Sequence, residues 1–352
     1  MKRTLLLLTL AIICTVPTAL TKSPPKRGLD IFFIDVEGGA ATLITTPLGE
    51  SVLVDTGWKR DDRRDALRIF KTAQAAGLNR IDHLVTTHFH RDHYGGILAL
   101  SQLIPVHNFY DHGPMTELKD DPGFAQLYAD YLKATGGKQI QLRPGDVIPL
   151  KAGKKIPISL FCVSSARQTL PAPPNAPANR VCTDLMPQPE DPSDNAASVG
   201  LRLRYGAFDF LDLGDLTRAI EAKLVCSSNV IGQIDVYQVT HHGMNVSNLP
   251  QLLDSVRPTV AIMNNGPKKG GHPDVYDILK SIITIKDVFQ LHRNLDTADW
   301  NNAPAYNIAN LVPEEACAGY GIRVSVAEDS KTFTVINSRP DSGARPAIYR
   351  VQ

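Results

Sequence analysis

Short apolar segments separated by glycine, proline and polar residues dominate the chain after residue 28. Residues 30–36, 41–46 and 51–55 are apolar or β-branched and are separated by Gly-Gly and Pro-Leu-Gly, which predicts three strands joined by hairpin-type turns. Residues 61–76 instead repeat their apolar positions every three or four residues, with acidic residues in the first turn and a glycine just after. This segment is therefore expected to be an amphipathic helix that lies on a sheet.

The rest of the chain continues the alternation of strands and helices. Residues 164–194 are the exception, because they are rich in proline, alanine, asparagine and aspartate and show no usable period. We expect them to form a long loop beside the functional site, either as a lid or as a disordered insertion. Further helices are expected around 124–132, 216–225 and 274–283, and further strands at 198–205, 207–213, 234–239, 258–263, 321–327 and 331–337.

The first residues have the features of a targeting segment. Lys2 and Arg3 precede an apolar run from Leu5 to Val16, and small residues follow around Ala19. The run is shorter than the roughly 20 residues that a membrane span needs. We therefore expect residues 1–22 to be a secretory signal peptide and the mature protein to be secreted or periplasmic, with no stable membrane insertion after cleavage. A short buried strand is the alternative.

Composition describes a globular protein with little net charge. The chain has 352 residues, of which 43% are hydrophobic and 21% charged, so it can bury one large core or two small ones. Its formal charge of +1 gives no overall attraction to nucleic acid or to an anionic membrane. An anionic substrate would have to be attracted by local charge and by metal.

Four cysteines remain after the expected signal peptide is removed, namely Cys162, Cys182, Cys226 and Cys317. An even number in an oxidising compartment favours two disulfides, for which three connectivities exist. Cys162 and Cys182 flank the proline-rich loop and are the preferred pair. The alternative is that some of them are buried free thiols, because a core of this size does not need disulfides.

The run from Thr87 to Gly96 contains the residue types that bind metal. His88, His90, Asp92 and His93 lie within six residues, directly after a segment at 83–86 that resembles a buried strand. Imidazole nitrogens and a carboxylate oxygen suit zinc, manganese or iron. The Gly-Gly pair that follows allows backbone to pack closely against the site.

This sequence motif resembles the signature of the metallo-β-lactamase superfamily. The order of motifs along the chain is similar to that in the hydrolase domain of DNA-uptake competence proteins and in phosphorylcholine esterases. The resemblance covers about residues 29–292. It implies a four-layer αββα sandwich of the α/β class, with one domain at 29–340 and a site for one or two metal ions. The other matching segments are Phe33-Ile34-Asp35-Val36, Ala41-Thr42-Leu43-Ile44, Leu53-Val54-Asp55-Thr56-Gly57, Leu213-Gly214-Asp215, His241-His242-Gly243 and Gly271-His272-Pro273.

The resemblance also implies a role for individual residues. Asp215 would bridge two metals, although an N-cap of the following helix is an alternative. His242 is favoured over His241 as the last ligand, with His241 as a supporting residue or substrate contact. Asp55 would orient a ligand or simply cap a turn. The expected ligands are His88, His90, Asp92, His93, Asp215 and a histidine at 241 or 242.

One position departs from the family pattern. Many members have a histidine before the strand that leads to the bridging aspartate, whereas this region reads Ser193-Asp194-Asn195-Ala196. Asn195 stands near the missing ligand and is expected to contact substrate. The first metal would then have His88, His90 and Asp215, the three protein ligands of an open catalytic zinc site.

A glycine-rich loop with two lysines precedes the helix at 274–283. Its sequence, Gly266-Pro267-Lys268-Lys269-Gly270-Gly271-His272, suits an anion cradle, although such turns are more often only solvated. Lys268 and Lys269 are expected to bind substrate. His272 and the lysines could stabilise charge that develops on a phosphoryl or carbonyl oxygen.

These features predict a secreted hydrolase that uses hydroxide activated by two divalent ions, with zinc expected and manganese or iron as alternatives. Asp92 and His272 are the expected catalytic residues, and Asp92 would accept a proton if only one metal binds. The leading substrates are phosphodiesters, including nucleic acid or phosphocholine conjugates. The alternatives are a hydrolase of lactams, lactones or other acyl substrates, and a binding protein that has kept the fold without catalysis.

Overall fold

The computed structural model describes residues 28–151, 153, 155–312, 317–343 and 346–352. The expected signal peptide at 1–22 lies outside these residues, so its cleavage and the export of the protein remain predictions. Within the described ranges, no helix is both long enough and apolar enough to cross a membrane.

The first sheet combines the amino-terminal half of the chain with its last three strands. Its order is β18-β17-β16-β1-β2-β3-β4-β5-β6. β1, β2 and β3 pair antiparallel, as the expected hairpins require, and β3 to β6 pair parallel. The strands are β1 Leu29–Phe33, β2 Thr42–Thr45, β3 Ser51–Val54, β4 Ile81–Val85, β5 Val106–Asp111, β6 Ile140–Gln141, β16 Ile322–Val326, β17 Thr332–Asn337 and β18 Ala347–Arg350.

The second sheet contains the middle of the chain, in the order β15-β14-β13-β12-β11-β10-β8-β7, with β9 paired to β8. β10 and β11 form the expected hairpin, and β11 to β15 pair parallel. The strands are β7 Val147–Ile148, β8 Ile158–Ser165, β9 Gln168–Thr169, β10 Gly200–Tyr205, β11 Phe208–Asp212, β12 Val236–Gln238, β13 Val260–Met263, β14 Asp287–His292 and β15 Ile308–Asn310.

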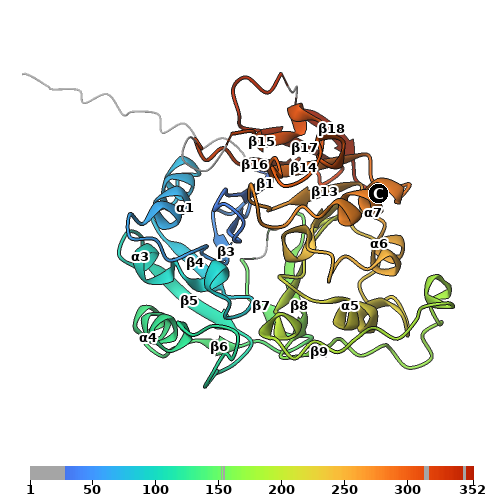
Figure 1. The fold of residues 1–352 in the computed structure, drawn as a ribbon, viewed down its shortest axis with the longest axis horizontal. Helices are drawn as coiled ribbons and strands as arrows, with labels where there is room; N and C mark the ends of the chain where they lie inside the picture. The colour runs from blue at the N-terminus through green and yellow to red at the C-terminus, as the bar shows by residue number, and fades with distance from the viewer. Residues whose placement is uncertain (1–27, 152, 154, 313–316, 344–345) are drawn as a thin grey trace, which may run out of the picture.

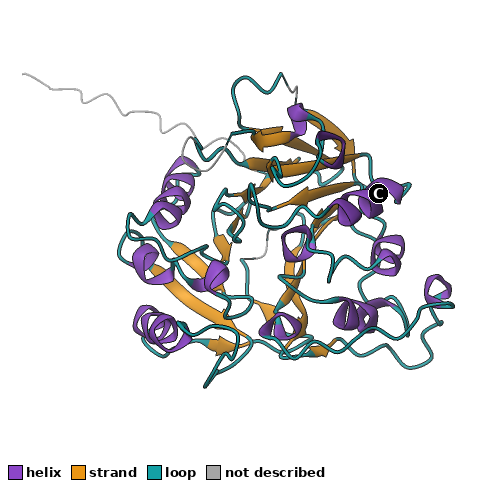
Figure 2. Cartoon of the chain, in the orientation of Figure 1, coloured by secondary structure: helices purple, strands orange, loops and turns teal. Residues whose placement is uncertain are grey.

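Helices cover the outer face of each sheet (Figures 1 and 2). In α1 the buried Ala66, Ile69 and Ala73 are spaced by three or four residues, so one face of the helix packs on the first sheet with α3 and α4. α5, α6 and α7 pack on the second sheet. The helices are α1 Arg64–Ala75, α2 Arg91–Tyr94, α3 Ile97–Ser101, α4 Phe124–Thr135, α5 Arg218–Val225, α6 Pro250–Val256 and α7 Pro273–Ser281, with 3₁₀ turns η1 Arg180–Cys182, η2 Asp194–Ala197, η3 Thr240–Gly243, η4 Asp299–Asn301 and η5 Ala305–Asn307.

A third apolar core lies between the two sheets. It combines side chains of β1 and β16 from the first sheet with side chains of β8, β10 and β11 from the second, including Phe33 and Phe210, whose rings meet edge to face. With the two outer cores this makes four layers, helix, sheet, sheet and helix, which confirms the predicted αββα sandwich. The first sheet continues past residue 340, the expected end of the domain, because β18 pairs with β17.

The disulfide differs from the preferred pairing. Cys182 is bonded to Cys226, at the end of α5, with their Cα atoms 5.3 Å apart. Cys162 cannot reach either residue because it lies within β8 and points into the core between the sheets. The bond fastens the middle of the proline-rich loop to α5, and Asn179 adds a hydrogen bond to the carbonyl of Val225.

Candidate metal centre

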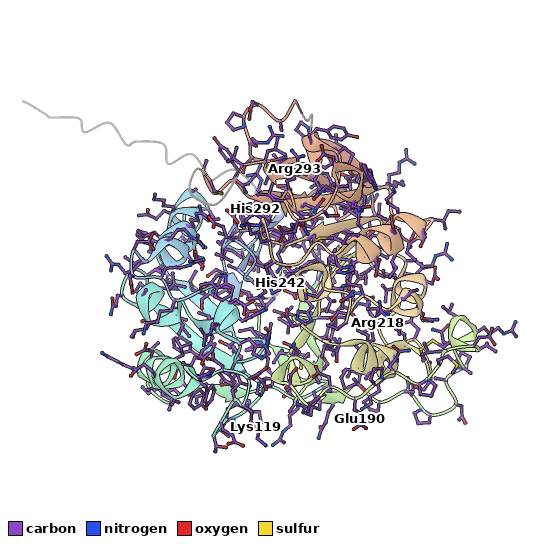
Figure 3. The ribbon with its side chains drawn as sticks, in the orientation of Figure 1. Lys119, Glu190, Arg218, His242, His292 and Arg293 are labelled. Carbon is purple, nitrogen blue, oxygen red and sulfur yellow. A yellow bond between two sulfur atoms is a disulfide. The ribbon has the colours of Figure 1, made fainter. Side chains whose placement is uncertain are left out.

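The expected ligands gather where strands of both sheets end. The histidine motif follows β4, Asp215 follows β11, and His241 and His242 follow β12. Ligands at the ends of strands are held by a rigid sheet, while their side chains remain free to point into a common space. Figure 3 shows His242 between the two halves of the molecule.

The end of the short helix α2 packs closely on the loop after β3, and the two glycines that follow the helix make this packing possible. A Cβ on Gly95 would lie 2.4 Å from the backbone nitrogen of Lys59, and one on Gly96 would lie 2.2 Å from the carbonyl oxygen of Thr56. Any larger residue would push α2 away from the loop after β3. The close backbone packing expected from the Gly-Gly pair is therefore present.

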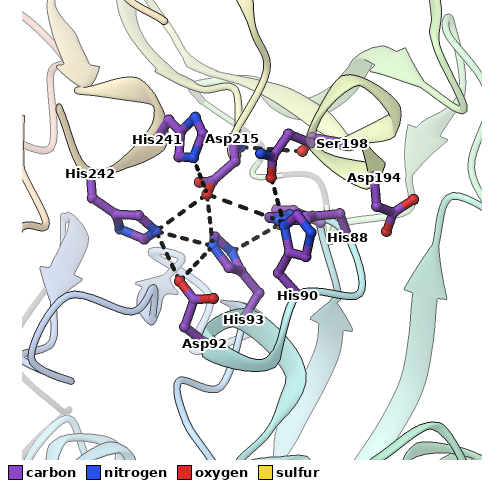
Figure 4. Close-up of polar contacts among 12 residues, drawn as sticks. His88, His90, Asp92, His93, Asp194, Ser198, Asp215, His241 and His242 are labelled. Atoms are coloured by element: carbon purple, nitrogen blue, oxygen red, sulfur yellow. Dashed lines mark hydrogen bonds and ion pairs between the residues drawn. The ribbon is translucent and has the colours of Figure 1, made fainter. Parts of the chain in front are cut away.

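Four side chains form the tightest group (Figure 4): Asp92, His93, Asp215 and His242, each offering one ligand atom within 4.8 Å of the others. The Nε2 atoms of His93 and His242 are 3.1 Å apart. Each Nε2 also faces Asp215 Oδ2, at 3.2 Å from His93 and 3.3 Å from His242. Asp92 Oδ2 closes the group, 3.2 Å from His242 Nε2.

A second group shares Asp215 with the first. His88 Nε2 is 3.9 Å from Asp215 Oδ2 and 3.0 Å from His90 Nδ1. Asn195 Oδ1 lies 2.7 Å from His90 Nδ1, so the residue at the departing position does reach this group. Asp215 thus stands between both groups, where a shared carboxylate would stand. It does not cap the following helix, because Thr217 occupies the N-cap position of α5.

Asp55 supports His93 from the side opposite the ligands. Its Oδ2 accepts a hydrogen bond from His93 Nδ1 at 2.7 Å, and its two oxygens also accept bonds from the backbone nitrogen and the hydroxyl of Thr87, each at 2.8 Å. These bonds place the proton of His93 on Nδ1 and leave Nε2 to face Asp92 and Asp215. Asp55 has a left-handed backbone with φ 62°, a strained conformation for a residue with a side chain.

The charge state of the groups suits a cation. Burial would raise the pKa of Asp92, but Lys269 and His93 outweigh it and hold that pKa well below its usual value. Burial would likewise raise the pKa of Asp215, and His242 and His93 hold it well below its usual value. Burial lowers the pKa of His88 well below its usual value. Burial would also lower the pKa of His93, but Asp215, Asp55 and Asp92 outweigh it and raise that pKa well above its usual value. Charged carboxylates and a neutral imidazole are the forms that bind metal, so His93 would release a proton when an ion binds.

The two histidines at 241 and 242 adopt consecutive left-handed backbones, with φ 57° and 54°. His242 is completely buried and contacts Asp92, His93 and Asp215, whereas His241 Nε2 contacts only Asp215 among these, at 3.4 Å. His241 Nδ1 lies 3.1 Å from the hydroxyl of Ser247. The structure thus places His242 in the tight group, as favoured, and His241 beside it.

The glycine-rich loop brings one of its lysines to this group. Lys269 Nζ contacts Asp92 Oδ2 and lies 5.0 Å from the centre of the Trp58 ring. Gly270 permits this approach, since a Cβ there would lie 2.1 Å from the carbonyl oxygen of His242. Lys268 is exposed.

His272 has a local structural role. Its Nδ1 accepts the backbone N–H of Asp274 and so caps α7, while its Nε2 lies 3.4 Å from the amide nitrogen of Asn245. Within the described part of the chain, these contacts do not include any expected ligand. The catalytic role of His272 remains a prediction.

Two residues that support the site had no signal in the sequence. Asp194 accepts the backbone N–H of Phe89 at 2.7 Å and lies 3.1 Å from His112 Nε2, so it holds the turn between His88 and His90. Asp120 reaches His90 Nε2 at 3.1 Å. The Asp194–Phe89 and Asp120–His90 contacts join residues at least 30 positions apart in the sequence, which no local spacing could reveal.

A cavity of about 780 Å³ opens beside Asp120, which contacts His90. It is lined by Asp120 and Asp194, and also by Arg167 and Ser193 from the two ends of the proline-rich loop. The expectation that this loop lies beside the functional site therefore holds for its ends. Its middle is bound to α5 by the disulfide.

The residues present fit a pair of divalent ions. Imidazole nitrogens and carboxylate oxygens converge in two groups, and Asp215 is common to both. Such a set suits zinc, iron or manganese. The first group would comprise His88, His90 and Asp215, and the second Asp92, His93, Asp215 and His242.

Residues 34–159 match the family model of the metallo-beta-lactamase superfamily. No curated protein matches the chain by sequence. Similar solved structures include CmlA, a diiron β-hydroxylase from Streptomyces venezuelae, with 16% identity, a TM-score of 0.41 and coverage of 69% of this chain and 46% of that chain. Zn²⁺-bound PqqB from Methylobacterium extorquens has 11% identity, a TM-score of 0.38 and coverage of 68% of this chain and 89% of that chain. A diphosphatase of the PhnP family has 12% identity, a TM-score of 0.36 and coverage of 68% of this chain and 87% of that chain.

The chain spans less than half the length of CmlA, and all three TM-scores are below 0.5. The sequence match places residues 34–159 in the metallo-beta-lactamase superfamily. The four-layer fold and the converging ligands of the described residues fit a metal-dependent hydrolase of that superfamily.

Proposed function

We propose that this hydrolase cleaves phosphodiesters and that its two ions are zinc. The observation that carries the proposal is the contact between Lys269 and Asp92, which puts an ammonium group at the edge of the ligand groups. A phosphodiester carries negative charge on the phosphoryl group that reacts, whereas the acyl group of a lactam or carboxylic ester is neutral. A cation at this place therefore favours a phosphodiester over a neutral acyl substrate.

Divalent ions, when bound, would lower the pKa of water and polarise a phosphoryl oxygen. The chain's own residues would bind and orient the substrate. Lys269 is long enough to leave Asp92 for a phosphoryl oxygen, and the Trp58 ring keeps its ammonium group close by. The cavity beside Asp120 has room for one of the two alcohol groups of the ester.

The proposal is tested by replacing Lys269 with methionine, which keeps the length of the side chain and removes its charge. We expect kcat/KM for bis(p-nitrophenyl) phosphate to fall about ten-fold or more, or about 1.4 kcal/mol in transition-state stabilisation. Turnover of a neutral chromogenic acyl substrate, p-nitrophenyl acetate, should change little. Metal content must be measured in both proteins, so that a loss of ions is not mistaken for a loss of substrate binding.

Lys280→Met is the matched control, because Lys280 also lies over an aromatic ring, 5.2 Å from the centre of Tyr276, but on α7. It should leave both activities unchanged. Lys268→Met tests the second expected lysine and should have a smaller effect than Lys269→Met, because Lys268 is exposed. Robust lactam hydrolysis by the parent protein without phosphodiesterase activity would replace this proposal with the acyl alternative.

Export from the cytoplasm is part of the proposal. The Cys182–Cys226 disulfide supports it, because disulfides persist in oxidising compartments. Fractionation of cells that express the full chain should find a shortened protein outside the cytoplasm. A full-length cytoplasmic protein would contradict it.

A further inference from the structure

A second group of potential ligands lies outside the centre described above. Asp35 follows β1, His292 ends β14, and Cys317 precedes β16, and their ligand atoms lie within 4.8 Å of one another. Asp35 Oδ1 is 2.7 Å from His292 Nε2, and Asp35 Oδ2 is 3.2 Å from Cys317 Sγ. Cys317 Sγ and His292 Nε2 are 4.0 Å apart.

These distances are close to those of a tetrahedral zinc site. With bonds of about 2.0 Å to nitrogen and oxygen and about 2.3 Å to sulfur, neighbouring ligands lie about 3.3 Å apart for N and O and about 3.5 Å for S and N. With these bond lengths, the Asp35–His292 distance would have to increase by roughly 0.6 Å and the Cys317–His292 distance to decrease by about 0.5 Å. Side-chain rotation can supply both shifts.

The charge around the group also allows a cation. The buried carboxylates Asp35, Glu37 and Asp65 face two guanidinium groups, Arg64 and Arg68. Arg60 also acts on Asp65, so these six side chains carry no net charge when all are ionised. A divalent ion bound to a thiolate would add one positive charge, directly beside the carboxylate of Asp35.

Asp35 can serve Arg68 and an ion at once. Arg68 donates to Oδ2 at 2.7 Å, while Oδ1 faces His292 and also accepts the backbone N–H of Glu37 at 2.9 Å. His292 is completely buried, and its Nδ1 has no hydrogen-bond partner in the part of the chain that the structure describes. The ring is therefore anchored through Nε2, the atom that faces both Asp35 and Cys317 and would bind the ion.

The group has access to solvent. Cys317 is half-buried and lines a cavity of about 800 Å³, together with Arg68, Lys71 and Tyr320. An ion could enter through this cavity, and a water molecule could fill the fourth coordination position. The thiol proton would leave by the same path, since binding exchanges that proton for the ion.

We propose that Asp35, His292 and Cys317 form a separate binding site for a zinc-class divalent ion. Thiolate, imidazole and carboxylate together suit zinc better than magnesium or calcium. The three ligands come from segments up to 282 residues apart and from both sheets. The ion therefore joins the ends of the two sheets.

This joint lies next to the loop that carries Lys269. The side-chain amide of Asn265 donates to the carbonyl of His292 at 2.8 Å, and that of Asn294 donates to the carbonyl of Gly270 at 2.9 Å. An ion bound to His292 would therefore stabilise the position of both ends of the glycine-rich loop. The site is structural and supports the rim of the hydrolytic centre without belonging to it.

Cobalt(II) distinguishes the two sites. Thiolate bound to cobalt absorbs in the near ultraviolet, whereas ligands of the hydrolytic centre include no cysteine. We expect metal-free protein titrated with cobalt under reducing-agent-free, anaerobic conditions to develop this band and to bind one ion more per chain than Cys317→Ser. Cys162→Ser is the matched control and should retain the band, because Cys162 is buried in β8.

Zinc should also slow the alkylation of Cys317 by iodoacetamide in the unaltered protein, as followed by peptide mass spectrometry. This second measurement does not depend on the folding of a variant. The proposal is overturned if saturating cobalt produces no near-ultraviolet band, or if the band survives in Cys317→Ser. The three residues would then form only a hydrogen-bonded group. That outcome would not bear on the proposed activity of the hydrolytic centre, which does not depend on this site.

Discussion

Replacing Asp55 by asparagine should weaken metal binding by acting on His93. The carboxylate accepts three hydrogen bonds, one from His93 Nδ1 and two from Thr87. An amide of the same size has one acceptor oxygen, so in either orientation its NH₂ group faces a donor. Where it faces His93, the ring proton must move to Nε2, the atom that points at Asp92 and Asp215.

The size of the effect follows from these contacts. Loss of a residue that orients a metal-binding histidine lowers metal affinity by about 10–100-fold, or about 1.4–2.7 kcal/mol. The buried donor that faces another donor should also lower the free energy of unfolding by about 1–3 kcal/mol. Calorimetric titration of the metal-free protein with zinc measures the first effect, and denaturant unfolding measures the second.

Asp82→Asn separates the two effects. Asp82 is also buried and accepts the backbone N–H and the hydroxyl of Ser51, each at 3.0 Å, but it lies near the start of β4, away from the ligands. This variant should lose stability and keep its zinc affinity. Equal zinc affinity in Asp55→Asn and the parent protein would refute the assigned role of Asp55.

Three further outcomes follow from other parts of the structure. Burial raises the pKa of Glu221 from 4.5 to about 7, so between these pH values the folded protein holds a proton that the unfolded chain has lost. The free energy of unfolding should therefore fall by up to about 3 kcal/mol as pH rises from 4.5 to 7. Melting curves of Glu221→Gln should lack this part of the pH dependence. Non-reduced peptide mapping should find Cys182 linked to Cys226, and replacing both by serine should cost at most about 4 kcal/mol, given the separation of 44 residues; recovery of both as free thiols would contradict the structure. Asn195→Ala should reduce the measured number of tightly bound ions or their affinity, because Asn195 Oδ1 contacts His90; unchanged binding would show that Asn195 serves only the substrate or the loop.

The sequence by itself determined the features that are encoded locally. Alternation and turn residues predicted β1 to β3 and the β10–β11 hairpin, because the period of a strand and the chemistry of a turn extend over a few residues. His88, His90, Asp92 and His93 were apparent for the same reason, since one turn brings them together. Asp215 and His242 were also indicated as neighbours of that turn, because each follows a predicted strand and because the order of the motifs resembles that of the family.

Only the tertiary structure decided which distant segments meet. The Cys182–Cys226 bond depends on where the proline-rich loop crosses α5, and the pairing of Lys269 rather than Lys268 with Asp92 depends on how the glycine-rich loop packs on His242. Asp194 and the group of Asp35, His292 and Cys317 likewise join strands of different sheets. Such contacts follow from the order and stacking of the strands, which the alternation of apolar and polar residues along one segment does not encode.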